Sequence, residues 1–123
     1  MLFTFKRIDH VQLAAPKGSE GMARAFYTGI LGFEEVEKPE VLRARGGVWF
    51  RAGENQLHLG IEEPFIPAKK AHPAFEVQKL EELKKHLIHH DISFVEDDLL
   101  PGANRIYAED PFGNRIELLE WKS

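Results

Sequence analysis

The chain has 123 residues, of which 43% are hydrophobic and 29% are charged, and these are ordinary values for one globular domain. It contains no cysteine, which excludes disulfides and thiolate ligands, and its net charge of −4 with scattered lysines and arginines argues against a nucleic-acid partner. No apolar run approaches the ~20 residues of a membrane span, and the first residues lack the charge order of an export signal, so we expect a cytoplasmic protein without a membrane partner.

The first half of the chain predicts a strand, a helix and three more strands. Residues 7–15 alternate between apolar and polar side chains, as in a half-buried strand. Met22, Phe26 and Ile30 then follow at helical spacing, and Ser19 stands at a position typical of an N-cap. The remaining predicted elements are a short strand over 33–38, a loop over 39–47, and a hairpin of 48–51 and 56–61.

The second half repeats this order after a proline-containing linker over 62–70. Leucines at 80, 83 and 87 form a helical stripe, opened by acidic residues and closed near Asp91. Three histidines near its end, at 86, 89 and 90, are predicted to be surface residues. The strands of this half are predicted at 71–77, 92–96, 105–109 and after the turn at 110–114 up to Trp121.

The two halves look like copies of one module. Residues 114–118 (Asn-Arg-Ile-Glu-Leu) align with residues 55–59 (Asn-Gln-Leu-His-Leu), and His10 and His72 are separated by a similar interval of 62 residues. The pattern predicts an α+β fold in which two βαβββ modules, about 6–62 and 71–121, form one domain over 1–123. A single module buries only one face of its sheet, so a pair is physically reasonable.

Four residues with metal-binding side chains occupy equivalent positions in the two halves. His10 and His72 lie on the first strands, and His58 and Glu117 lie on the last strands. A pseudo-twofold relation between the halves would bring all four to one concave face, where a divalent Zn, Ni, Co, Mn or Fe ion would be bound. We assign catalytic roles to Glu117 and to His58, which is either a fourth ligand or a general base.

Hairpin counting indicates which residues lie beside these four. It places Trp49 opposite His58 and Tyr107 opposite Glu117. We expect aromatic and cationic side chains on this face to bind a small-molecule substrate, although aromatic packing and solvated arginines explain them equally well. The predicted substrate-binding residues are Trp49, Arg51, Arg105, Tyr107 and Trp121.

Five motifs, spread over nearly the whole chain, recur in one known superfamily. They are Asp9-His10-Val11, Phe26-Tyr27 with Leu31-Gly32-Phe33, Trp49-Phe50 with Gln56-Leu57-His58-Leu59, His72-Pro73-Ala74-Phe75-Glu76-Val77, and Asp110-Pro111-Phe112-Gly113-Asn114-Arg115-Ile116-Glu117-Leu118. With them the chain resembles the vicinal oxygen chelate superfamily, which includes glyoxalase I, fosfomycin-resistance proteins, extradiol dioxygenases and bleomycin-resistance proteins.

The resemblance implies paired βαβββ modules that form a cupped mixed sheet with helices on its outer face. It also implies a divalent metal and a homodimer whose subunits can share the site, with His10, His72 and Glu117 at the usual ligand positions. Where glyoxalase I carries a glutamate, this chain has His58. The arginine that fosfomycin-resistance proteins carry beyond the last ligand is absent, because none of the six residues after Glu117 is arginine.

Three functions remain open at this stage. The leading one is a metal-dependent isomerase, lyase or thiol transferase acting on a small substrate with neighbouring oxygens. The second is a dioxygenase with an Fe(II) site of two histidines and one carboxylate. The third is a protein like the bleomycin-resistance members, which binds an aromatic or cationic molecule without turnover.

Overall fold

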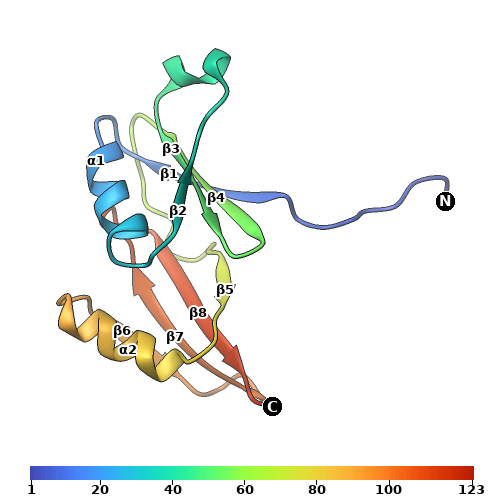
Figure 1. Cartoon of the computed structure of the whole chain (residues 1–123), viewed down its shortest axis with the longest axis vertical. Helices are drawn as coiled ribbons and strands as arrows, with labels where there is room; N and C mark the ends of the chain where they lie inside the picture. The colour runs from blue at the N-terminus through green and yellow to red at the C-terminus, as the bar shows by residue number, and fades with distance from the viewer.

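The computed structural model describes residues 1–123 and contains two modules, each with its own four-stranded sheet (Figure 1). The first module comprises β1 (His10–Ala15), α1 (Glu20–Ala23), η1 (Arg24–Thr28), β2 (Glu34–Val36), η2 (Glu40–Arg45), β3 (Val48–Ala52) and β4 (Asn55–Ile61). The second comprises β5 (Ala74–Glu76), α2 (Leu80–His89), β6 (Phe94–Asp97), β7 (Ala103–Glu109) and β8 (Arg115–Trp121). The predicted α+β fold of two βαβββ modules is confirmed. No helix is both long and apolar enough to cross a membrane.

Both sheets are built in the same way. The strand order is β1-β4-β3-β2 in the first and β5-β8-β7-β6 in the second, and the first strand of each module pairs in parallel with the last. The other pairings are antiparallel, and they confirm the predicted opposition of Trp49 to His58 and of Tyr107 to Glu117. β1 and β5 are both edge strands. No strand of one sheet pairs with a strand of the other.

Of two local predictions for the first module, one holds in position and one was wrong. Ser19 is the N-cap residue of α1 as predicted, although its backbone is already in the right-handed helical region and its buried side chain makes no capping hydrogen bond. The predicted loop over 39–47 contains the 3-10 helix η2. None of its residues is fully buried, and its sequence carries no apolar stripe that hydrophobic spacing would reveal.

The modules are joined by a core and by a small buried hydrogen-bond network. Tyr27, which is fully buried on η1, donates a hydrogen bond of 2.7 Å from its hydroxyl to Oδ2 of Asp110 in the β7–β8 turn. The Asn114 side chain, also fully buried, donates to the carbonyl oxygen of Ala14 on β1 at 2.8 Å. Burial makes these polar groups costly to leave unpaired, so the network fixes how the second module sits against the first.

Candidate metal and substrate site

The first half of the site is a stack of three aromatic rings on neighbouring strands. The imidazole of His58 lies parallel to the indole of Trp49, with centroids 3.8 Å apart, and to the imidazole of His10 on its other side, at 4.1 Å. The pleat produces this arrangement, because Trp49 is directly opposite His58 and β1 is the next strand on the other side. His10 is exposed, whereas His58 is only 4% exposed.

The environment of His58 keeps its ring neutral at pH 7. Burial, followed by the neighbouring His10, lowers the pKa of His58 to about 4. Its Nε2 lies 2.8 Å from Oε1 of Gln56. A neutral imidazole retains one nitrogen lone pair, so His58 has the protonation state that a metal ligand or a general base requires.

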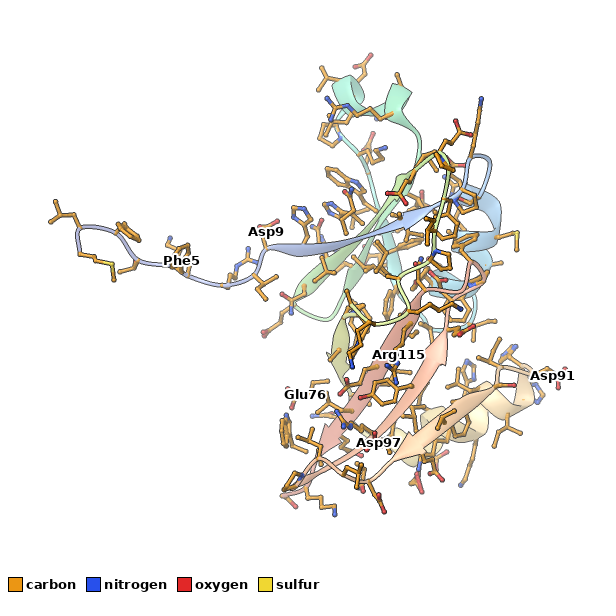
Figure 2. All side chains as sticks on the ribbon, turned by 180° about the vertical axis from the view of Figure 1, so that it is seen from behind. Phe5, Asp9, Glu76, Asp91, Asp97 and Arg115 are labelled. Atoms are coloured by element: carbon orange, nitrogen blue, oxygen red, sulfur yellow. The ribbon has the colours of Figure 1, made fainter.

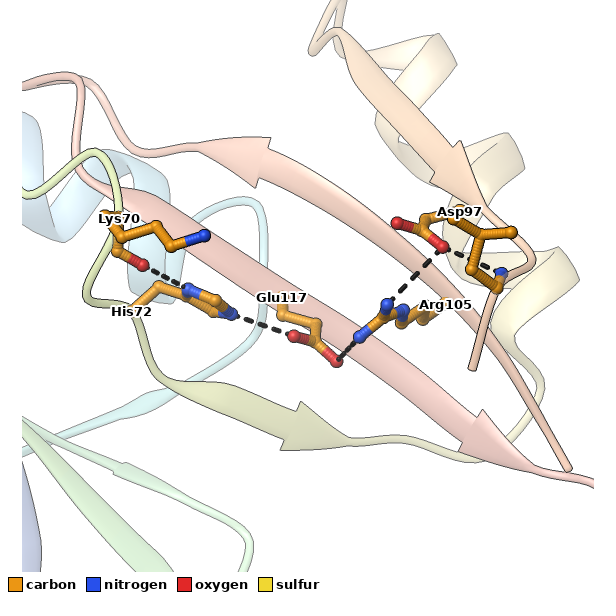
Figure 3. A network of polar contacts seen from close by, with 6 residues as sticks. Lys70, His72, Asp97, Arg105 and Glu117 are labelled. Carbon is orange, nitrogen blue, oxygen red and sulfur yellow. Dashed lines mark hydrogen bonds and ion pairs between the residues drawn. The ribbon is translucent and has the colours of Figure 1, made fainter. Parts of the chain in front are cut away.

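The second half of the site is a contact between His72 and Glu117, both in the second module. His72 lies just before β5, and its Nε2 is 2.9 Å from Oε1 of Glu117 on β8 (Figure 3). His72 Nδ1 lies 2.7 Å from the carbonyl oxygen of Lys70. A carbonyl oxygen can only accept, so Nδ1 carries the proton and Nε2 is directed at the carboxylate. Glu117 is only 5% exposed.

Arg105 holds the other oxygen of the same carboxylate. Its Nη1 lies 3.4 Å from Oε2 of Glu117, and its Nη2 lies 3.4 Å from Oδ1 of Asp97 (Figure 3). Arg105 therefore pairs with the carboxylates of Asp97 and Glu117, and Glu117 also contacts His72, so the four side chains form one row. Arg105 Nε is buried and has no hydrogen-bond partner.

Arginines also surround Tyr107, which packs edge-on against His72 at 5.4 Å between centroids. The guanidinium carbon of Arg115 is 3.8 Å from the centre of the Tyr107 ring, and that of Arg105 is 5.3 Å away. Arg115 was not among the predicted site residues. Strand parity would have identified it, because Arg115 is two residues before Glu117 on β8 and therefore shares its face.

A hollow of about 410 Å³ opens beside His10 and His58. Its lining includes two cationic residues that hydrophobic patterning did not single out, Lys38 and Arg45. Lys38 donates a hydrogen bond to the carbonyl oxygen of Gly46, and it is one of the charges that lower the pKa of His58. Lys38 lies between β2 and η2, and Arg45 lies on η2. These segments had been predicted as strand and loop without a functional role.

Within one chain the predicted metal ligands form two pairs rather than one centre. His10 and His58 are together, as are His72 and Glu117, but no group of three His, Cys, Asp or Glu side chains gathers around a common point. Trp49, Arg105 and Tyr107 touch these pairs. Arg51 instead lies 3.5 Å from Glu34, and Trp121 is 51% exposed near Gly102.

The fold and these motifs match a known superfamily. Residues 7–118 match the model of the Glyoxalase/Bleomycin resistance protein/Dioxygenase superfamily. The chain is 51% identical to a candidate glyoxalase family protein from Bacillus anthracis, over 99% of this chain and 100% of that one, with a TM-score of 0.97. The chain therefore belongs to this superfamily, whose members generally bind divalent metals and small substrates and often form dimers.

Solved structures of two more distant proteins share the fold. A lactoylglutathione lyase from Agrobacterium tumefaciens is 23% identical, with a TM-score of 0.74, covering 93% of this chain and 92% of that one. A fosfomycin resistance protein from Listeria monocytogenes is 16% identical, with a TM-score of 0.76, covering 95% and 94%. No curated protein matches the chain.

Proposed function

We propose that the protein is a metal-dependent enzyme whose site is assembled from two copies of the chain. His10 and His58 of one subunit would face His72 and Glu117 of the other. The observation that carries this proposal is the separation of the four residues into two pairs, each with too few donors to hold an ion alone. A twofold pair of chains would contain two such sites, each with one pair from each subunit.

The donor groups fit a divalent transition metal. His10 Nδ1 lies 3.0 Å from Oδ1 of Asp9, and His72 Nδ1 is held by the Lys70 carbonyl. Metal-binding histidines are commonly oriented in this way, by a carboxylate or a carbonyl on the nitrogen that does not bind the ion. Two or three imidazoles and one carboxylate are a suitable set for Zn, Ni, Co, Mn or Fe.

The chemistry we propose is isomerase, lyase or thiol-transfer chemistry on a small substrate with neighbouring oxygens. A bound divalent ion would act as a Lewis acid on those oxygens and stabilise negative charge that develops there. His58, neutral at pH 7, would be a fourth ligand or would take a proton from the substrate. Glu117 would be held in place by Arg105 while it contributes its other oxygen.

The hollow beside His10 indicates a substrate that carries an anionic group. Lys38 and Arg45 line it together with Trp49 and His58, so it offers positive charge beside an aromatic wall. An anionic group would pair with the two cations, and an apolar or planar part would lie against Trp49.

Two alternatives have some support. Two histidines and one carboxylate are also the donors of an Fe(II) dioxygenase. The rings of Trp49 and Tyr107 would suit a protein that sequesters a molecule without converting it. A tight ligand whose affinity is unchanged by a chelator would favour sequestration, and oxygen uptake with a catechol would favour the dioxygenase.

Mixing two inactive variants tests whether subunits share the site. His10→Ala and Glu117→Ala each impair both sites of a homodimer, but one site of the mixed dimer would have His10 from one chain and His72 and Glu117 from the other. Subunit exchange at equal mixing should therefore restore metal binding to about a quarter of the wild-type level. Activity, measured in a screen of thiol conjugates, epoxides and α-oxoaldehydes, should return to the same extent.

The matched control mixes His10→Ala with His58→Ala. Both changes lie in the same half, so every site of the mixed dimer keeps one defect and nothing should be restored. Elemental analysis after gel filtration gives the metal content of each mixture. Restoration in neither mixture, despite subunit exchange, would reject a shared site, and equal, negligible metal in the wild type and in His72→Ala would reject a metal site altogether.

A further inference from the structure

The first nine residues form an arm that leaves the first module without packing on the rest of the chain (Figures 1 and 2). Its apolar side chains are almost fully exposed: Leu2 is 107% exposed, Phe5 94% and Phe3 61%. The side-chain hydrogen bonds of residues 1–9 remain local, between Arg7, Ile8, Asp9 and His10. So much exposed apolar surface on one short segment is typical of a segment that binds another surface.

A groove of about 720 Å³ follows β5, one of the two edge strands of the second sheet. β5 has only three residues and pairs with β8 on one side alone, so its other side presents unpaired backbone groups. The groove has an apolar wall and a charged rim of Glu54, Glu76 and Arg51. The larger apolar residues of the wall are Leu31, Phe33, Phe75, Val77, Leu83 and Leu118.

We propose that the arm of one chain adds as a strand to the free edge of β5 in a second copy of this chain and inserts Phe5 into this groove. The proposal rests on the shared site described above. If His10 of one subunit and His72 of the other face one ion, the pseudo-twofold relation between the first module of one chain and the second module of its partner makes β1 and the partner's β5 neighbouring antiparallel strands. The residues that precede His10 then run along the partner's β5.

The register that follows contains one oppositely charged pair and one apolar pair. With His10 opposite the partner's His72, Lys6 falls opposite the partner's Glu76, and Phe5 falls opposite the partner's Val77. Oppositely charged residues that face each other across two strands attract. Strand alternation turns Phe3 and Phe5 to the sheet face that carries Phe75 and Val77, which is the apolar wall of the groove.

The arm and the groove of one chain are well separated. Phe5 lies far out on the arm in Figure 2, whereas Glu76 lies on β5 of the second sheet, so the arm of this chain does not occupy its own groove. A second copy supplies an arm of suitable shape and charge, and its position is continuous with the proposed site. The interaction is strand addition, in which backbone hydrogen bonds provide affinity and side-chain pockets provide specificity.

Because the chain has no cysteine, two introduced cysteines can test this pairing without interference. Lys6→Cys and Glu76→Cys are made as separate proteins, allowed to exchange subunits, and oxidised. We expect a covalent dimer in the mixture and little in either protein alone. The control replaces Glu76→Cys by Val95→Cys, an exposed residue on the edge strand β6. Equal cross-linking to both positions, or none to residue 76, would overturn the proposal.

Solution measurements provide an independent test. Phe5→Ser should raise the dimer dissociation constant at least tenfold, since it removes a buried aromatic side chain from each of two interfaces. Val41→Ser, at a position on η2 that is 87% exposed, should leave that constant unchanged. Lys6→Glu should also weaken the dimer, and the double variant Lys6→Glu/Glu76→Lys should recover it.

The outcomes separate this proposal from the shared site. Suppose that mixing His10→Ala with Glu117→Ala restores metal binding while Phe5→Ser leaves the dimer dissociation constant unchanged. That result would refute the proposed role of the arm and leave the shared site intact. A cross-link within single chains of a Lys6→Cys/Glu76→Cys double variant would likewise refute the exchange of arms. Loss of the shared site with the cross-link retained would refute only the proposed function.

Discussion

Nε2 of His72 lies 2.9 Å from Oε1 of Glu117, although 45 residues separate them in the chain. The contact exists because β5 and β8, the first and last strands of the second module, run side by side in parallel. In the first module the same strand relation brings His10 beside His58. The repeated architecture thus places a pair of donor side chains at the same point of each sheet.

Arg105→Gln should weaken metal binding. Arg105 holds Oε2 of Glu117 and so leaves Oε1 facing His72, and the loss of such an orienting group typically costs about 10-fold to 100-fold in metal affinity. Competition titration with a chromophoric chelator measures the change. Arg24→Gln, which breaks the surface pair with Glu35 on another element, is the matched control. An unchanged affinity in Arg105→Gln would mean that Arg105 does not orient the ligand.

The stability of the metal-free protein should fall in mild acid because of His58. Its pKa is about 4 when folded, against an ordinary value of 6.5, so the unfolded chain binds more protons between these values. The contribution of His58 to the free energy of unfolding is complete above pH 6.5. It declines by up to about 3 kcal/mol as the pH falls to about 4. Urea unfolding at pH 7 and pH 4.5 should show a smaller difference for His58→Asn than for the wild type. His89→Asn, an exposed residue, should behave like the wild type.

Tyr27→Phe should lower the free energy of unfolding by about 1–3 kcal/mol, because it removes the donor of a buried hydrogen bond to Asp110. Burial and the Asp110 carboxylate also raise the pKa of Tyr27 well above 10. The folded state therefore retains this proton to a higher pH than the unfolded chain. The stability that this provides is present below pH 10 and is lost as the pH rises further. Denaturant unfolding at pH 8 and pH 10.5 measures both effects. Tyr107→Phe is the control, and equal losses in the two variants would contradict the assigned role of Tyr27.

Glu120→Gln should destabilise α2. The Glu120 carboxylate accepts hydrogen bonds from the backbone N–H groups of Lys79, at 2.8 Å, and Leu80, at 3.0 Å, and these bonds lower the pKa of Glu120. Its contribution is present above pH 4.5 and is lost as the pH falls through the lowered pKa. The melting temperature of the variant should be reduced at pH 7 and should approach that of the wild type in acid. Glu62→Gln, in the exposed linker, should show neither effect.

The alternation of side chains was sufficient to predict the strands and the pairing of Trp49 with His58 and Tyr107 with Glu117. Strand periodicity fixes which face a residue occupies, and a short turn fixes the residue opposite. The same reasoning predicted that all four donor side chains converge on one centre, whereas within one chain they form two separate pairs. It did not predict that β1 and β5 remain at separate sheet edges, since the packing of one module on another depends on contacts such as Tyr27–Asp110, across 83 residues.

Roles that depend on charge partners were also beyond local patterns. Arg105 was predicted to bind substrate, and its position between Asp97 and Glu117 makes it a structural neighbour of the proposed ligand as well. Lys38 and Arg45 lie on segments whose placement depends on η2, which has no apolar periodicity. Their position beside His58 emerges only when distant segments of the chain are packed together.

The unpaired edges of β1 and β5 have a consequence for the newly synthesised protein. Each edge presents backbone groups that any extended peptide could satisfy, so a lone chain is open to association with unrelated strands. Formation of the homodimer would compete with such misassembly, and the rate of dimer formation depends on the concentration of the protein. At low expression, solubility should therefore depend on how quickly two copies meet.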